Sequence, residues 1–279
     1  MNIFRIFSSK QATSPSPILR EIKPGPTKMG MLIQEINSSH TLTQVRALSQ
    51  LSRQVGFDNT LPKDIVDVVP VLVKMLSEEP TDQHVCEYAA KILGIIREKG
   101  GKEIVLTATV LPILTNVIER KDKFSPIARS EALIAVGYFG KEAKDIIPLI
   151  ISLLGDRDED SYADISAACA LKEIAKEAKE EVKQALINAL NNSNDHLRGS
   201  AAASLGIIFK KEAKDALEIL VNGLHDKSAH VRRSCALTLG YMGKEAESAT
   251  LDLVKLLADK SENVTETSKW ALTEIAKEL

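Results

Sequence analysis

The sequence predicts an all-α fold, a right-handed α-solenoid (α-α superhelix) of about seven helix pairs. Two ladders of repeated residues support this prediction. The first ladder marks the residue after the last large apolar position of a small-residue helix, and its copies stand 33 to 43 residues apart at Ser52, Gly94, Gly137, Lys172, Gly206, Gly240 and Thr273. The second repeats Lys-Glu-Ala in the same register, starting at Lys141, Lys176, Lys211 and Lys244. A fixed period of this length is typical of stacked helical units.

The chain divides into a tail and one repeat domain. Residues 1–27 are rich in Pro and Ser and are predicted to be a flexible tail, whereas residues 28–279 form the solenoid. Basic residues without acids, and Ile-Phe clusters, leave an organellar transit peptide or an interfacial anchor open as alternatives for the first twenty residues. No apolar run is long enough to cross a bilayer, so no membrane-spanning segment is expected. The expected location is the cytoplasm.

Apolar residues take helical spacing from Met29 onward, and no stretch alternates with period two. The predicted helices are 29–38, 42–55, 63–77, 83–98, 103–119, 126–139, 143–154, 162–176, 179–191, 196–208, 213–224, 229–241, 246–258 and 263–278. Short links such as 140–145 separate them, with turn chemistry supplied by Asp226 and Asp259. Prolines are expected one turn inside the first helix of three pairs, at Pro70, Pro112 and Pro148.

Composition narrows the function. The chain is 44% hydrophobic but only 4% aromatic, so Ala and Leu build a core of closely packed helices. The formal net charge is −2, with +4 in residues 1–60 and −6 in the remainder, and an acidic array is a poor binder of nucleic acid. Three widely spaced cysteines, Cys86, Cys169 and Cys235, are predicted to be buried thiols in a reducing compartment.

Two stretches carry a family resemblance. The segments GLHDKSAHVRRSCALTLG (223–240) and ALNNSNDHLRGSAAASLG (189–206) resemble HEAT repeats, a class of armadillo-like helical repeats, and specifically the phycobilisome-lyase HEAT-like subfamily. The resemblance implies that the turn acid pairs with the arginine six residues later. It matches Asp226 with Arg232, and Asn192 with Arg198 with an amide in place of the acid. It also implies a possible role as a subunit of a bilin lyase.

Candidate metal, nucleotide and acyl-transfer sites are poorly supported. The histidines His84, His196 and His230 occupy equivalent repeat positions and are expected to lie about one repeat apart, too far for one zinc ion. The run Asp156, Asp158 and Asp160 has the spacing of a calcium loop, but the Gly and Glu that complete such a loop are absent. No phosphate-binding or nucleophile-elbow motif occurs. No cofactor or metal is therefore expected.

The arginines that follow the repeated apolar residue have two interpretations. Arg129, Arg198 and Arg232 could form a row that reads phosphate groups, or they could bind the turns of the repeats. The structural interpretation is favoured because two of the three have a turn partner six residues back.

The second helix of each pair carries the candidate binding residues. Counting from Val231, the residues two, six and ten positions later point away from the buried face. These columns predict a partner-binding set of Tyr138, Ile207, Arg233, Tyr241 and Trp270. Aromatic and aliphatic residues on a groove are common anchors for a partner protein or peptide. The competing interpretation is that these side chains pack against the neighbouring repeat.

The sequence thus favours a non-catalytic scaffold or adaptor that binds a protein or peptide on its concave helix face. The alternative is a bilin lyase subunit or chromophore-handling chaperone, as the family resemblance implies. Nucleic-acid binding would require a basic groove, against which the charge balance argues.

Overall fold

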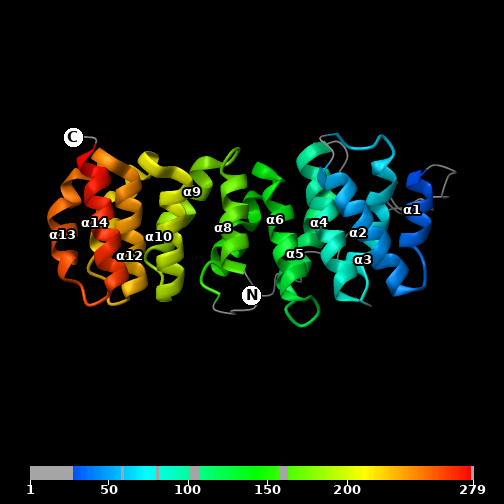
Figure 1. The fold of residues 1–279 in the computed structure, drawn as a ribbon, viewed down its shortest axis with the longest axis horizontal. Helices are drawn as coiled ribbons and strands as arrows, with labels where there is room; N and C mark the ends of the chain where they lie inside the picture. Colours follow the sequence, from blue (N-terminus) through cyan, green and yellow to red (C-terminus); the bar gives the residue numbers. More distant parts are fainter. Residues whose placement is uncertain (1–27, 58–59, 80–81, 101–106, 157–162, 278–279) are drawn as a thin grey trace, which may run out of the picture.

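A computed structural model describes residues 28–57, 60–79, 82–100, 107–156 and 163–277, and these form an all-helical stack (Figure 1). The α-helices are α1 (Lys28–Ile36), α2 (Thr41–Phe57), α3 (Val69–Ser77), α4 (Gln83–Gly100), α5 (Thr107–Glu119), α6 (Pro126–Gly137), α7 (Ile147–Leu153), α8 (Ala163–Ile174), α9 (Lys179–Ala189), α10 (Asp195–Phe209), α11 (Leu217–Gly223), α12 (Ala229–Met242), α13 (Thr250–Lys255) and α14 (Glu262–Ala276). The described residues contain no strand. The tail predicted at residues 1–27 lies outside them.

Consecutive helices pair, so that α1 packs with α2, and each later odd helix packs with the even helix after it. The described residues thereby make seven units. The even-numbered helices α2 to α14 form one layer, the second-helix layer, and the odd-numbered helices line the other side (Figure 1). Each unit packs on its neighbours in the row, which gives an elongated array. The predicted α-solenoid is therefore confirmed.

The core runs through the array as one apolar strip. In α12 the residues at helical spacing, Val231, Cys235, Leu239 and Met242, are all buried, at 0–2% exposure. Equivalent Ala, Val, Ile and Leu residues of the other helices are buried beside them. Since a unit covers only one face of its own helices, the neighbouring units must cover the other.

Glycines allow the second helices to approach each other closely. A Cβ added at Gly137 of α6 would lie 2.9 Å from the Cα of Ala170 in α8, and one at Gly206 of α10 would lie 2.9 Å from the Cα of Thr238 in α12. Gly94 and Gly240 make the same kind of contact with the helix that follows. The first ladder in the sequence is thus a ladder of helix contacts.

The links between units are more ordered than predicted. Three of the four Lys-Glu-Ala segments form the 3₁₀ helices η4 (Gly140–Ile146), η5 (Lys210–Ala216) and η6 (Gly243–Ala249), and their alanines are buried. The helices that follow therefore begin about four residues later than expected. For the same reason Pro70 and Pro148 stand at the first positions of α3 and α7, not one turn inside them, whereas Pro112 does lie within α5.

The cysteine prediction needs one correction. Cys86 and Cys235 are buried, but Cys169 on α8 is exposed. Burial raises the pKa of the Cys86 thiol to about 11 and that of Cys235 to about 12, so both stay protonated at neutral pH. Cys169 stands on α8 at the repeat position of Leu237 and Trp270, which points away from the buried face of the helix.

Candidate functional site

The second-helix layer displays the predicted binding residues in two separate groups. Tyr138 follows the last residue of α6 and is half-buried, whereas Ile207 on α10 is 50% exposed. Arg233 and Tyr241, both on α12, are exposed, and Trp270 on α14 is half-buried. Because α8 and α10 lie between Tyr138 and α12, the five residues do not form one cluster.

Tyr241 and Trp270 lie in contact. Their rings meet edge to face, with centroids 5.2 Å apart and planes at 71°. Trp270 also packs on Gly240, where an added Cβ would come 2.4 Å from the ring atom Cζ3. Trp270 is therefore partly a packing residue between repeats, while Tyr241 remains 36% exposed beside it. An aromatic pair of this kind offers a partner a rigid apolar surface.

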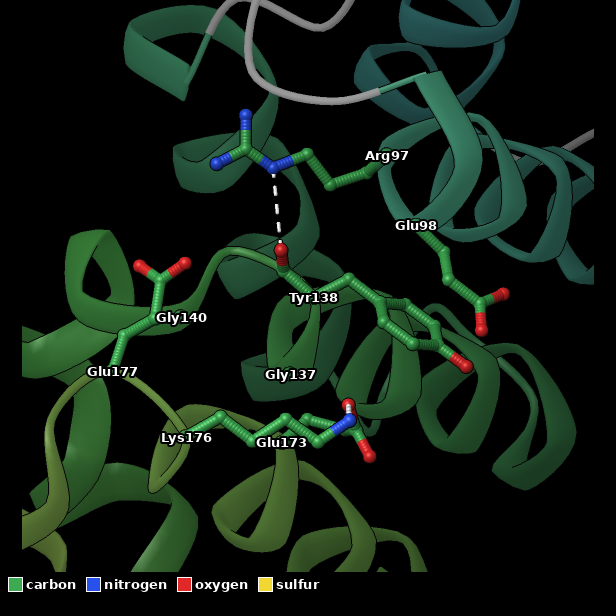
Figure 2. Close-up of a pocket in the computed structure, with 8 residues that line it drawn as sticks. All are labelled: Arg97, Glu98, Gly137, Tyr138, Gly140, Glu173, Lys176 and Glu177. Carbon is green, nitrogen blue, oxygen red and sulfur yellow. Dashed lines mark hydrogen bonds and ion pairs between the residues drawn. The ribbon is translucent and has the colours of Figure 1, made fainter. Parts of the chain in front are cut away.

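Tyr138 borders a cavity of about 290 Å³ between α4, α6 and the end of α8 (Figure 2). The cavity is lined by Arg97, Glu98, Gly137, Tyr138, Gly140, Glu173, Lys176 and Glu177. Gly140 has a φ of +56°, and its missing side chain leaves room for the carboxylate of Glu177. The segment after α6 therefore turns sharply and leaves the Tyr138 ring at the rim of the cavity.

Arg97 holds the backbone of this segment and was not singled out by the sequence. Its side chain is 3% exposed, with Nε donating to the carbonyl oxygen of Tyr138 at 3.3 Å and Nη2 to Glu142 Oε2 at 2.5 Å. The guanidinium also lies 4.6 Å from the centroid of the Phe139 ring. A basic residue near the end of a helix is ordinarily a solvated one, so its burial becomes visible only once α4 and α6 are placed together.

Three acids and two bases line the cavity. Burial raises the pKa of the Tyr138 hydroxyl, and the charges of Glu98 and Glu173 raise it further. The phenol therefore stays protonated at neutral pH and can donate a hydrogen bond. Lys176 pairs with Glu173, and both residues line the cavity. This arrangement can bind a polar group of a partner beside the aromatic ring.

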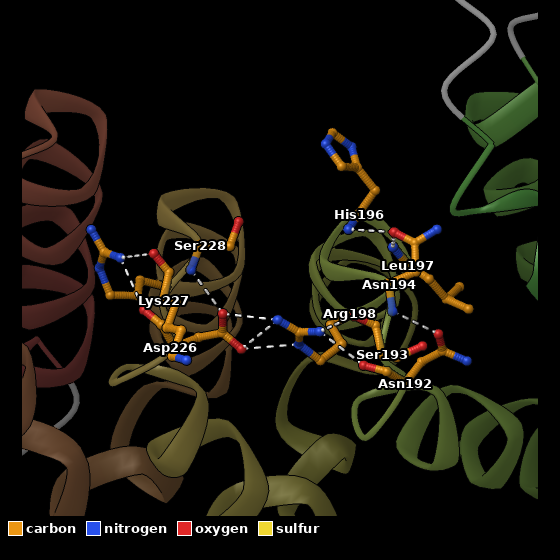
Figure 3. Close-up of polar contacts among 10 residues, drawn as sticks. Asn192, Ser193, Asn194, His196, Leu197, Arg198, Asp226, Lys227 and Ser228 are labelled. Carbon is orange, nitrogen blue, oxygen red and sulfur yellow. Dashed lines mark hydrogen bonds and ion pairs between the residues drawn. The ribbon is translucent and has the colours of Figure 1, made fainter.

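The arginine row, which consists of Arg129, Arg198 and Arg232, binds parts of the repeats themselves. Figure 3 shows the contacts of Arg198. Arg198 donates through Nη1 to the carbonyl oxygens of Asn192 and Ser193, at 2.8 and 3.0 Å. Its Nε and Nη2 donate to both carboxylate oxygens of Asp226 in the next repeat, each at 2.9 Å. The guanidinium thus closes its own turn and grips the following unit.

Arg232 makes the same contacts one repeat later, and they correct the pairing that the family resemblance implied. Its Nη1 donates to the backbone carbonyl of Asp226 at 2.9 Å, while its Nε and Nη2 bind Asp259 at 2.7 and 2.8 Å. The Asp226 side chain accepts from the Ser228 amide and faces the preceding repeat, so it cannot pair with Arg232. Asn192 likewise contributes its backbone carbonyl rather than its amide.

Arg129 is the third member of the row and is buried, at 4% exposure, with Nε donating to the carbonyl oxygen of Ile118 at 2.9 Å. All three arginines therefore hold turns or helix ends.

Two of the three equivalent histidines lie together, and the third does not. His196 and His230 are closer than predicted, because their rings stack with centroids 5.3 Å apart. Burial lowers the pKa of His230, and His196 and Arg233 lower it further, so this ring is neutral at pH 7. His84 instead contacts Glu87, with Nδ1 at 2.9 Å from Oε2. Within the described ranges, no group of three His, Cys, Asp or Glu residues is placed to hold a metal ion.

The fold and its ladder of inter-repeat contacts define a protein built from tandem helical repeats. A family model described as HEAT repeats matches residues 111–206 and 184–273, which together exceed half of the chain. The chain therefore belongs to the HEAT-repeat family. No curated protein matches it. None of the helices in the described part is both long and apolar enough to span a membrane.

Solved structures share the fold at low sequence identity. Importin β in an ammonium sulfate condition matches with a TM-score of 0.68 and 16% identity, over 88% of this chain and 35% of that one. Kap121p bound to RanGTP matches with a TM-score of 0.65 and 13% identity, over 88% and 30%. Kap121p bound to the extreme C-terminus of the protein phosphatase Cdc14p matches with a TM-score of 0.69 and 14% identity, over 88% of this chain and 29% of that one. The chain spans about a third of the length of these structures.

Proposed function

We propose that this chain is a non-catalytic scaffold that binds a protein or peptide partner on the second-helix layer, taken as its concave face. The partner-binding surface consists of Tyr138, Ile207, Arg233, Tyr241 and Trp270. One observation carries the proposal, which is that apolar and aromatic side chains of this layer stay open to solvent while the core beneath them is closed. Ile207 is 50% exposed and Tyr241 is 36% exposed next to Trp270.

The arginines of the repeats support the same conclusion, because their side chains already have hydrogen-bond partners within the protein. The guanidinium groups of Arg198 and Arg232 donate hydrogen bonds to turn carbonyls and to the aspartates of the next repeat. The arginine row therefore has little left for an anionic ligand. Recognition is expected to rest on aromatic anchors, with Arg233 supplying an exposed positive charge at the edge.

The comparisons agree with a binding role. The two Kap121p structures similar in fold to this chain contain a protein and a protein C-terminus as partners. A layer of parallel helices presents a long surface, which suits an extended or helical peptide. The family model describes HEAT repeats in general, and nothing in the second-helix layer favours a bilin over a protein partner.

An affinity pull-down read by mass spectrometry tests the proposal. The bait is the full chain, alongside a variant without residues 1–27 and the double variant Tyr138→Ala/Tyr241→Ala. The matched control is Leu251→Ala, because Leu251 is an apolar residue of α13, in the other helix layer, and is 75% exposed. Each bait is checked by circular dichroism, so that a loss of binding is not a loss of fold.

We expect one partner to be retained by the full chain, the tail-deleted chain and the Leu251 control, and to be lost by the double variant. A partner that survives the double variant but is lost with Leu251→Ala would place the binding site in the other layer. Absorbance changes on mixing the chain with a bilin, in the absence of any protein partner, would favour the chromophore alternative.

A further inference from the structure

The second-helix layer is interrupted at one position. Every other pair of neighbouring second helices packs closely, but α8 and α10 approach each other at only a few residues. Figure 1 shows these two helices standing apart, with α9 at one side of the interval. We call this junction between α8 and α10 the seam.

The glycine ladder has an exception at the seam. In α4, α6, α10 and α12 the ladder residue is a buried glycine against which the next helix packs. At those glycines an added Cβ would already meet the next helix at 3.0 Å or less. In α8 the same position holds Lys172, which is exposed. A side chain of that length keeps α10 from reaching the packing distance of the other helices.

Exposed apolar side chains lie on both helices of the seam. The open arrangement therefore leaves apolar surface in contact with water. Ile165 on α8 is 60% exposed and Ile207 on α10 is 50% exposed. Closing the seam would remove apolar surface from water, which is favourable. It would also require the Lys172 stem to bend aside so that its ammonium group stays in water. The two effects oppose each other.

The other helix layer stays joined across the same junction. Here α7 packs on α9 and touches α10. The Nδ2 of Asn194 donates to the carbonyl oxygen of Gly155 at 3.3 Å, and a Cβ added at Gly155 would come 2.8 Å from the Cβ of Leu197. One layer is therefore a tight spine while the facing layer is open, which is the arrangement of a hinge.

We propose that the seam is a hinge about which two stacks, α1–α8 and α9–α14, bend relative to each other. Within each stack, neighbouring second helices pack closely against each other, and the stack moves as one body. The bending closes and opens the second-helix layer at Lys172. If the proposed function holds, the hinge also sets the separation between the Tyr138 cavity on one stack and the Tyr241–Trp270 pair on the other.

Spin labels placed across the seam test the hinge in the full-length protein. One label uses the native Cys169, and the other uses Ile207→Cys, with Cys86 and Cys235 replaced by alanine. The matched control pair lies one repeat later at the same two positions, Ala203→Cys and Tyr241→Cys, with Cys169→Ala added. Double electron–electron resonance then gives the distribution of distances within each pair.

We expect the seam pair to show a longer and broader distance distribution than the control pair. Lys172→Gly should shift the seam pair towards the shorter, narrower distribution of the control, whereas Lys172→Arg, which keeps a long cationic side chain, should leave it unchanged. A seam pair as narrow as the control pair would overturn the hinge. A broad seam pair that does not respond to Lys172→Gly would overturn the assignment of the hinge to Lys172.

Discussion

Leu239 shows what one side chain contributes to this array. It lies on α12, is 0% exposed, and belongs to the apolar strip that continues from unit to unit. Removing a buried leucine side chain costs the transfer free energy of the lost atoms and that of the cavity left behind. The residue therefore stabilises the core that its unit shares with the rest of the array.

Leu239→Ala is expected to lower the free energy of unfolding by about 2–5 kcal/mol. Leu251→Ala, at a leucine that is 75% exposed, should change it by less than about 0.5 kcal/mol. Urea denaturation followed by circular dichroism measures both. Equal effects of the two substitutions would contradict the register of the buried face.

The aspartate–arginine contacts predict a loss of stability in acid. Hydrogen bonds from Arg232 are the main cause of the lowered pKa of Asp259, against which burial acts in the opposite direction. The unfolded chain keeps the ordinary pKa of about 3.8, so the unfolded state binds a proton first as the pH falls. The stabilisation is complete above that pKa and is lost as the pH falls through the lower pKa of the folded state.

The measurement is the free energy of unfolding between pH 7 and pH 3, in the full chain and in Asp259→Asn. The variant should be less stable at pH 7 and should lose less stability on acidification. Parallel pH profiles would show that Asp259 does not contribute in this way.

Several of these residue-level features could not be read from the sequence. The pair Asp226–Arg232 was predicted because the two lie six residues apart, yet the carboxylate binds Arg198 of the preceding repeat. A prediction from spacing along the chain pairs residues that are close in sequence. A bidentate contact instead requires the planar guanidinium and the carboxylate to face each other. Arg97 was missed for the same reason, since its partners Tyr138 and Glu142 lie more than forty residues away.

At the scale of the elements, the glycine ladder decides how closely two helices pack. A Cβ at Gly206 would lie 2.7 Å from Thr238 Oγ1 and 2.9 Å from its Cα, so the two helices would have to separate. Thr238 Oγ1 also donates to the carbonyl oxygen of Ala202 on α10 at 2.6 Å, and that bond would be strained. Gly56, near the end of α2, has nothing within 4 Å of such a Cβ.

Gly206→Ala and Gly56→Ala should therefore have effects of opposite sign. The first is expected to cost about 1–3 kcal/mol through overpacking. The second should increase stability by about 0.5–1 kcal/mol, because alanine favours the helix. Thermal unfolding of the two single variants provides the comparison. A stabilising effect at Gly206 would refute its role as a contact residue.

Helix order and pairing were largely predictable, since apolar residues at helical spacing mark the buried face of each helix. The starts of α7, α11 and α13 were not, because Lys-Glu-Ala has good helix propensity in isolation. In the folded chain its alanine is buried under the neighbouring unit, and the segment tightens into a 3₁₀ turn. Packing between units overrides local propensity there.

At the scale of the whole molecule, the candidate site was only half predictable. The columns predicted residues that lie on the second-helix layer, and Ile207 and Tyr241 are exposed as expected. The grouping was not accessible, because it depends on how far apart the repeats lie. Lys172 was visible as an exception in the ladder, but its consequence required the spacing between α8 and α10. Tyr138 is thereby separated from the aromatic pair on α12 and α14.

The contacts of Arg198 and Arg232 have a consequence for how such a chain can change its length. Each arginine closes the turn of its own unit and binds the aspartate of the next, and the two arginines stand 34 residues apart in equivalent places. A tandem duplication of one such stretch would supply a new arginine for the old aspartate and a new aspartate for the old arginine. The arginine–aspartate contact would then form at both ends of the inserted repeat. The C-terminal units can therefore grow by copying, without any second mutation to repair the join.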